Sequence, residues 1–232
     1  MIEQPALTLE DVDVDGAVAE GLAHLHGETR ATFLRRAVVG GGALLAAFAT
    51  PSQAVAKGVG SHDLAIFNFA LALEYLQAAF YSEVDRLGKL TGPLSHQAHV
   101  VGAHERAHVK AFLNVLGDKA IKRPAYDFRG ATESPTRFSR TAVAFEDLAV
   151  AAYKGQAPHI RARELLVPAL GIHAVEARHA AWIRRLAGAS PVLGAFDEPV
   201  TRKRSLGVVA ATHFTVADSV PTRSRRSPRF TG

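Results

Sequence analysis

The sequence predicts an all-α fold, a four-helix bundle in which two antiparallel helical hairpins are joined by one long crossover. Four segments of helical length and composition lie between residues 61 and 188. The first two are separated by a short connection, and so are the last two, whereas the polar, proline-containing residues 117–139 separate the second from the third. Short connections join antiparallel neighbours. Because an up-and-down bundle needs three short connections, the loop lengths favour two hairpins and a crossover.

The first hairpin has clear helix boundaries. Its first helix is predicted from Ser61, a candidate N-cap, to Gly88, a residue typical of helix ends, and the run between them is rich in alanine, leucine and phenylalanine. Its second helix is predicted from Ser95 to Gly117. The few residues between these helices make them antiparallel neighbours.

The crossover and the second hairpin have weaker signals. Residues that interrupt helices recur in the crossover, namely Pro124, Gly130 and Pro135. The third helix is predicted from Ser139 as its cap to Gly155, and the fourth from Arg163 to Gly188. Because Pro168 lies inside the fourth segment, we expect either a kink in its first turns or a later start.

Composition places the bundle in residues 57–200, after a leader over 1–56 and before a tail over 201–232. The chain of 232 residues is 48% hydrophobic with a net charge of +5, which excludes wholesale disorder. The tail has 7 bases and 1 acid, which predicts a flexible, solvated segment and no specific nucleic-acid binding. The absence of cysteine excludes disulfides, cysteine nucleophiles, zinc fingers and thiolate-bound iron–sulfur clusters.

The leader has the order of a secretory signal. Basic residues from Arg30 to Arg36 precede an uncharged apolar run over 37–49, and residues 54–56 form an A-x-A cleavage site. The apolar run is too short for a confident membrane span, and cleavage would leave Lys57 as the first mature residue with no stable span.

Residues 29–35 resemble a twin-arginine export signal, with the Phe33-Leu34 pair of that pattern and Ala31 in place of its second arginine. This resemblance implies contact with the export machinery and a location in the periplasm, the cell envelope or outside the cell. Ordinary secretion remains open because of Ala31, and so does an amphipathic N-terminal helix that stays on the protein.

Single carboxylates interrupt apolar helical sequence at two places. Glu74 lies in the apolar run of the first helix, and Glu146 lies in that of the third, with Asp147 beside it as the solvated alternative. A buried lone carboxylate is costly unless it is paired, protonated or bound to a metal.

The second and fourth helices each carry Glu-x-x-His. The two motifs are Glu105 with His108 and Glu176 with His179. Positions three apart share one face of a helix, so each motif offers a carboxylate and an imidazole to the same point of the bundle. Measured along the helices, Glu74 and Glu105 lie about 20 and 15 Å from the turn between them, which is nearly one height.

One glutamate from each of two helices and Glu-x-x-His from each of the other two make the ligand set of di-iron and di-manganese carboxylate bundles. Four carboxylates and two neutral imidazoles suit two divalent ions, iron first and manganese as the alternative. Their charge of −4 would offset the +4 of the metals.

The chain resembles the ferritin-like superfamily, and within it the exported ferritin-like proteins that include desiccation-related proteins. The resemblance runs from about Ser61 to Phe196 and is carried by FALALEYL at 69–76, AYKG at 152–155 and VEARHAA at 175–181. It implies a dinuclear metal site that reacts with dioxygen or peroxide, with bridging and terminal roles open. The ligands that it implies are Glu74, Glu105, His108, Glu146, Glu176 and His179.

Two tyrosines recur at the same spacing from the predicted ligands. Tyr81 follows Glu74 by seven residues, and Tyr153 follows Glu146 by seven. Each is therefore a candidate hydrogen-bond donor near the centre, with an ordinary buried tyrosine as the equal alternative. His173, three residues before a motif glutamate, is either an extra ligand or a packed histidine.

Two other functions remain open. His104-Glu105-Arg106-Ala107-His108 also spells H-E-x-x-H, the motif of zinc hydrolases, although that assignment leaves the other four candidate ligands unexplained. A non-enzymatic exported bundle that binds metal, or serves envelope stress tolerance as a structural protein, would keep the same fold. Assembly into a homo-oligomer is left open by the sequence.

Overall fold

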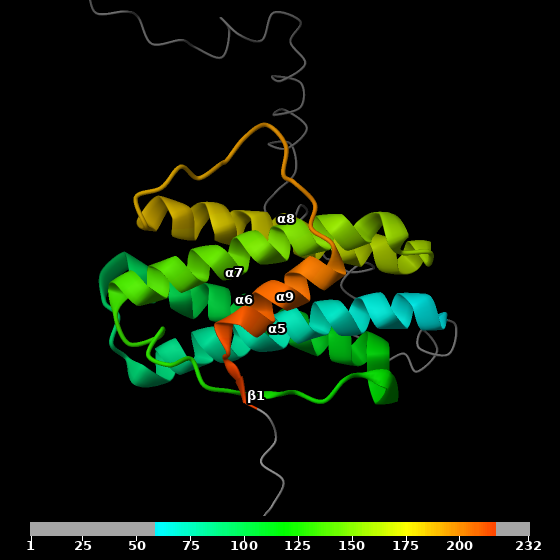
Figure 1. The fold of residues 1–232 in the computed structure, drawn as a ribbon, viewed down its shortest axis with the longest axis horizontal. Helices are drawn as coiled ribbons and strands as arrows, with labels where there is room; N and C mark the ends of the chain where they lie inside the picture. The colour runs from blue at the N-terminus through cyan, green and yellow to red at the C-terminus, as the bar shows by residue number, and fades with distance from the viewer. Residues whose placement is uncertain (1–58, 217–232) are drawn as a thin grey trace, which may run out of the picture. The chain divides into compact units, whose positions relative to one another are not determined.

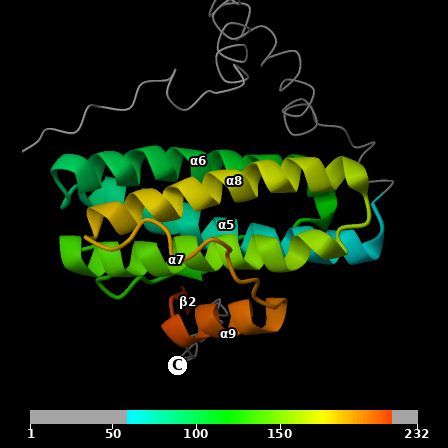
Figure 2. The ribbon, with the colours of Figure 1, turned by 90° about the horizontal axis from the view of Figure 1, so that it is seen from above.

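A computed structural model of the chain describes residues 59–216, so the predicted leader lies outside the described residues. Four long helices form the bundle, and a short helix packs against two of them (Figures 1 and 2). In chain order the elements are α5 (Ser61–Leu87), α6 (Gly92–Leu116), the 3-10 turn η1 (Gly117–Lys119), β1 (Ala125–Tyr126), α7 (Pro135–Gln156), the 3-10 turn η2 (Ala157–His159), α8 (Arg163–Leu186), α9 (Arg202–Thr212) and β2 (Thr215–Val216).

The predicted fold class is confirmed. Helices α5 and α6 pack along each other as one hairpin, and α7 and α8 pack as the other. The long connection between α6 and α7 runs along the outside of the bundle, as the green segment of Figure 1 shows. The described part of the chain is thus an all-α bundle with the connectivity that the loop lengths predict.

The first hairpin differs from expectation mainly at the start of its second helix. Helix α5 ends where predicted, because Gly88 adopts the left-handed conformation with φ of 60° and donates its N–H to the carbonyl of Val84. Helix α6 begins at Gly92 instead of Ser95, with a proline in its first turn. Proline is tolerated there because the first N–H groups of a helix have no intrahelical partner.

The start of the third helix differs from expectation, again because proline is tolerated in the first turn of a helix. Helix α7 begins at Pro135, which was expected to interrupt a helix, and Ser134 caps it by accepting the N–H of Arg137 at 3.3 Å. Ser139, the predicted cap, lies inside the helix. Helix α8 starts at Arg163 as predicted and continues through Pro168 as one helix.

A buried acid near the start of α5 holds the beginning of α8. Asp63 is 3% exposed, and its carboxylate accepts the N–H groups of Arg161 and Ala162, the latter at 2.8 Å. Ala162 is the residue that precedes α8. In the sequence, an acid in the first turn of a helix indicates only a favourable interaction with the helix dipole. The hydrogen bonds from Asp63 to the start of α8 could therefore not be predicted.

The segment after residue 200 differs from the expected flexible tail. Thr201 caps α9 by accepting the N–H of Arg204, and β2 pairs antiparallel with β1 of the crossover. The ring of Phe214 lies 5.4 Å from that of Phe128. Apolar residues that lie between the bases make this contact, and a count of charges does not indicate it. Residues 217–232 lie outside the described part of the chain.

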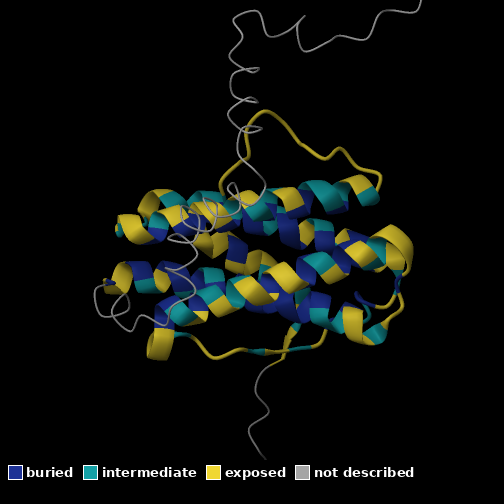
Figure 3. Ribbon diagram, turned by 180° about the vertical axis from the view of Figure 1, so that it is seen from behind, coloured by how far each residue is buried: buried dark blue, intermediate teal, exposed yellow. Residues whose placement is uncertain are grey.

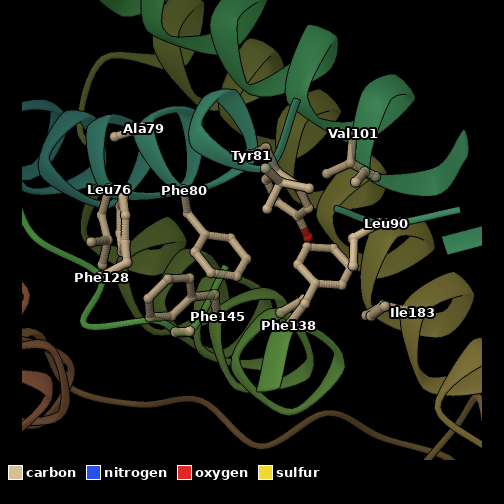
Figure 4. Packing of buried hydrophobic residues seen from close by; sticks show 14 residues of the cluster. Leu76, Ala79, Phe80, Tyr81, Leu90, Val101, Phe128, Phe138, Phe145 and Ile183 are labelled. Atoms are coloured by element: carbon tan, nitrogen blue, oxygen red, sulfur yellow. The ribbon is translucent and has the colours of Figure 1, made fainter. Parts of the chain in front are cut away.

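The buried faces of the four long helices turn toward one another (Figure 3). At one end, Phe80 packs against Phe128, Phe138 and Phe145, with ring centroids 5.2 to 5.5 Å apart (Figure 4). By length and composition, α5 alone among the described helices could span a membrane, and 78% of its most apolar stretch is buried in the bundle. That burial is the pattern of a core helix.

Candidate metal centre

Each bundle helix contributes to one buried cluster of carboxylates and imidazoles. All four carboxylate side chains have no exposed surface, and the two imidazoles are 12% and 3% exposed. The structure brings together the six candidates that the sequence singles out, Glu74 from α5, Glu105 and His108 from α6, Glu146 from α7, and Glu176 and His179 from α8.

These side chains form two overlapping groups that could each hold a metal ion. One joins Glu74 and His108 to Glu105 and Glu176, and within it the ligand atoms lie within 4.8 Å of one another. The other joins Glu146 and His179 to the same two acids within the same limit. Glu105 and Glu176 belong to both groups, which places them between the two candidate ion positions. The sequence left these bridging roles open.

Both imidazoles turn Nδ1 toward the carboxylates. The oxygens nearest His108 Nδ1 are those of Glu176 at 3.1 Å, Glu74 at 3.2 Å and Glu105 at 3.6 Å. The oxygens nearest His179 Nδ1 are those of Glu105 at 3.0 Å, Glu146 at 3.5 Å and Glu176 at 3.8 Å. Each inward nitrogen therefore faces oxygens from three helices.

The carboxylate oxygens have too few partners within the protein. Apart from the facing imidazoles of His108 and His179, both oxygens of Glu105, both of Glu176 and one of Glu146 are buried without a hydrogen-bond partner. Anionic oxygens in such surroundings are costly unless a cation compensates them. Hard oxygen donors with two imidazole nitrogens suit divalent iron or manganese, so this donor set fits the metals that the sequence indicates.

Burial dominates the acid–base behaviour of the carboxylates. It raises the pKa of Glu105 well above its ordinary value, and neighbouring acids add to that effect. It also raises the pKa of Glu146 to about 7. At Glu176 burial acts in the same direction, but hydrogen bonds with His108 and His179 outweigh it and lower the pKa to about 2.

Despite burial, the facing carboxylates raise the pKa values of the two imidazoles. Burial disfavours the charged form of both, but the facing carboxylates outweigh it, raising the pKa of His108 and raising that of His179 to about 12. Protons on the imidazoles thus compensate part of the buried negative charge in the metal-free chain. A divalent ion would displace protons from the nitrogens that it binds.

The two tyrosines connect the hairpins crosswise. Tyr81 of α5 donates its hydroxyl to Oε1 of Glu146 on α7 at 2.5 Å, and Tyr153 of α7 donates to Oε1 of Glu74 on α5. Both hydroxyls are buried, and burial followed by the adjacent carboxylate raises both tyrosine pKa values well above their ordinary range. Each tyrosine therefore contacts the carboxylate of the opposite hairpin, a relation that the spacing along one helix does not reveal.

His104 lies at the surface and touches the cluster from outside. Its Nδ1 lies 2.9 Å from Nε2 of His179, and the two rings stack with centroids 5.2 Å apart. Burial and the neighbouring imidazoles lower the pKa of His104. It belongs to neither group that could hold a metal among the described residues.

The remaining candidates lie away from the cluster. Asp147 points out of the bundle and pairs with Arg184 through both of its oxygens, so Glu146 is the buried member of that acidic pair. His173 lines a small apolar cavity that Tyr153 also borders, and it is not grouped with the six residues. Of the alternatives left open for His173, its position favours a packed histidine.

The chain belongs to the ferritin-like family. Residues 62–189, which include the four bundle helices, match the family described as ferritin-like domain. A comparison with curated proteins gives no match. The protein is therefore a ferritin-like bundle with a buried Glu/His cluster that could bind metal.

Proposed function

We propose that the protein is an exported ferritin-like protein that binds two iron ions, or two manganese ions, between its helices and uses them in protection against oxidative or desiccation stress. The observation that carries the proposal is the set of buried, unpartnered carboxylate oxygens on Glu105, Glu146 and Glu176. Gathering such oxygens in an apolar core is costly, and two bound cations would offset that cost.

The six residues have different expected roles in metal binding. Glu105 and Glu176 are placed to contact both ions. Glu74 and His108 would complete the coordination of one ion. Glu146 and His179 would complete the coordination of the other. The site's four carboxylates at −4 would neutralise two divalent ions, so the loaded centre would carry little net charge.

The surroundings favour redox chemistry over hydrolysis. Iron(II) ions bound there would supply the two electrons that, with two protons, reduce one hydrogen peroxide to two waters. Tyr81 and Tyr153 would hold Glu146 and Glu74 in place through their hydroxyls, and the apolar clusters on either side would limit water access.

Export is the part of the proposal that rests on sequence alone. The basic residues, the apolar run and the A-x-A site before Lys57 support a cleaved leader of twin-arginine type. Export would place the protein in the envelope or outside the cell, where peroxide or free iron(II) is the substrate that we infer. The desiccation-related resemblance supports the same setting.

A non-enzymatic metal-binding bundle is the second candidate function. The same orphaned oxygens favour it equally, because they indicate bound cations and do not indicate turnover. The zinc hydrolase alternative is disfavoured by the position of His104, whose Nδ1 is engaged with His179 outside both candidate groups.

Metal content and turnover test the proposal in one preparation. The full chain, purified without chelators, is reconstituted anaerobically with iron(II) or manganese(II), and bound metal is counted by plasma mass spectrometry. We expect two equivalents per chain, with peroxide consumed by the iron form. Two equivalents without turnover would select the binding module, and one zinc or no metal would refute the dinuclear centre.

Substitution of one acid in each group tests the ligand assignment. In the Glu74→Gln/Glu146→Gln double variant, we expect loss of at least one equivalent of metal, because each candidate position loses a charged donor. Asp147→Asn is the matched control, since Asp147 neighbours Glu146 in sequence but faces Arg184. Unchanged stoichiometry in the double variant would remove Glu74 and Glu146 from the site.

A further inference from the structure

His104 joins the protein surface to one candidate ligand. It is exposed on α6, immediately before Glu105, whereas the His179 side chain is 3% exposed on α8. The two rings are nearly parallel, at 16° to each other, and the 2.9 Å separation of Nδ1 and Nε2 is a hydrogen-bond distance. This contact crosses between the hairpins, and neither the bundle core nor the proposed ligand set accounts for it.

The donor and acceptor roles in this contact follow from which nitrogen faces the cluster. Nδ1 of His179 points at the carboxylates of Glu105 and Glu146, so it is the nitrogen that a metal ion would bind. A neutral imidazole that binds metal through Nδ1 carries its proton on Nε2. The Nε2–H group then needs an acceptor, and Nδ1 of His104 is in place to be one.

We propose that His104 is a positioning residue for His179, accepting the hydrogen bond of its Nε2–H and thereby holding Nδ1 toward the ion bound by Glu105, Glu146 and Glu176. The proposal rests on the metal centre proposed above and assigns His104 no contact with the metal. Ligating histidines ordinarily donate their second N–H to a fixed acceptor, which sets the tautomer and the ring orientation.

The two candidate metal positions differ in what lies behind their histidines. His104 precedes the glutamate of the first Glu-x-x-His motif, and the corresponding residue of the second motif is Val175. The valine side chain has no hydrogen-bond acceptor. The position completed by His179 therefore has a side-chain acceptor behind its histidine, supplied by the opposite motif, while Val175 cannot provide one for His108. We expect the His179 position to bind its ion more tightly.

Manganese(II) titration, followed by the electron paramagnetic resonance signal of the free ion, measures both positions. In His104→Ala, one of the two equivalents should bind about 10- to 100-fold more weakly, the range found when such partners are removed. His104→Asn should restore most of the affinity, because its Oδ1 stands where Nδ1 stood and accepts the same hydrogen bond. Val175→Ala is the matched control and should leave both equivalents unchanged.

Nuclear magnetic resonance of the histidine rings in the zinc-loaded full chain reports which ring nitrogen carries the proton. A merely structural role of His104 would not determine that tautomer. We expect His179 and His104 both to carry their proton on Nε2, with Nδ1 of His104 free of metal. A proton on Nδ1 of His104 would overturn the proposal. A metal-shifted Nδ1 of His104 would also overturn it and would support the zinc motif instead.

The outcomes separate this inference from the proposed function. If the wild-type chain binds no metal, both fail. If it binds two equivalents and His104→Ala gives a superimposable isotherm, only the positioning role fails. Thermal unfolding of the metal-free variants shows whether they are folded. If His104→Ala does not fold, His104→Phe, which keeps a ring and removes the acceptor, replaces it and should give the same weakening of one equivalent.

Discussion

We expect the crossed tyrosine hydrogen bonds to contribute measurably to stability before any metal binds. Tyr153→Phe removes the hydroxyl that donates to Glu74 and leaves the ring in place. Both side chains are buried, and that of Glu74 has no exposed surface, so we expect no water to replace the lost donor. A hydrogen bond to a charged group contributes about 1.5–3 kcal/mol, and we expect the free energy of unfolding of the metal-free chain to fall by that amount.

Tyr81→Phe should give a similar loss above about pH 8, where Glu146, with its pKa raised to about 7, is ionised and accepts the Tyr81 hydroxyl at 2.5 Å. For a chain of this length, 1 kcal/mol corresponds to roughly 2–4 °C, so each variant should melt about 3–12 °C lower. The double variant should depart from additivity, since both carboxylates belong to one network of charges.

Tyr75→Phe is the control for these measurements. Its hydroxyl donates to the carbonyl of Ile121 at 3.4 Å, a long and weak hydrogen bond at the edge of the bundle. Chemical unfolding of the metal-free full chain, monitored by circular dichroism, compares the variants. If Tyr153→Phe differed from wild type no more than Tyr75→Phe does, the hydroxyl would not stabilise Glu74, and the reasoning would be refuted.

Two further predictions concern the frame around the site. Asp63→Ala removes the acceptor of the N–H groups of Arg161 and Ala162, so it should lower the free energy of unfolding by about 1–3 kcal/mol. Metal stoichiometry should stay at its wild-type value. An unchanged denaturation midpoint would contradict this prediction. Gly155→Ala should speed hydrogen exchange at the amide of Val200, because a β-carbon at residue 155 would overlap the Val200 carbonyl oxygen and displace the segment that leads to α9. Gly207→Ala, where a β-carbon meets open space, should leave that exchange rate unchanged.

The arrangement of helices could be predicted because loop length and helix-end chemistry are local properties. Gly88 ends α5 through its own backbone conformation, and the short connection after it leaves α6 only one way to pack. Helix starts were less predictable where proline was involved. Pro135 reads equally well as a breaker or as a first-turn residue, and the choice depends on whether Ser134 caps the helix.

The segment after residue 200 shows where composition misleads. Its charge predicts a solvated tail, but α9 packs against α7 and β2 pairs with β1. These contacts join residues far apart in the chain. They depend on Gly155 leaving room for Val200 and on Phe214 reaching Phe128, and no local pattern reveals either.

The six clustered acids and histidines were identifiable from sequence because helical periodicity and apolar surroundings already place them on inward faces at nearly one height. Which carboxylates lie between both ion positions, which tyrosine meets which glutamate, and that His104 reaches His179 were decided only when the two hairpins packed together. Periodicity specifies the face that a side chain occupies along its own helix. Contacts between hairpins depend on the relative rotation and height of two helices, which tertiary packing alone determines.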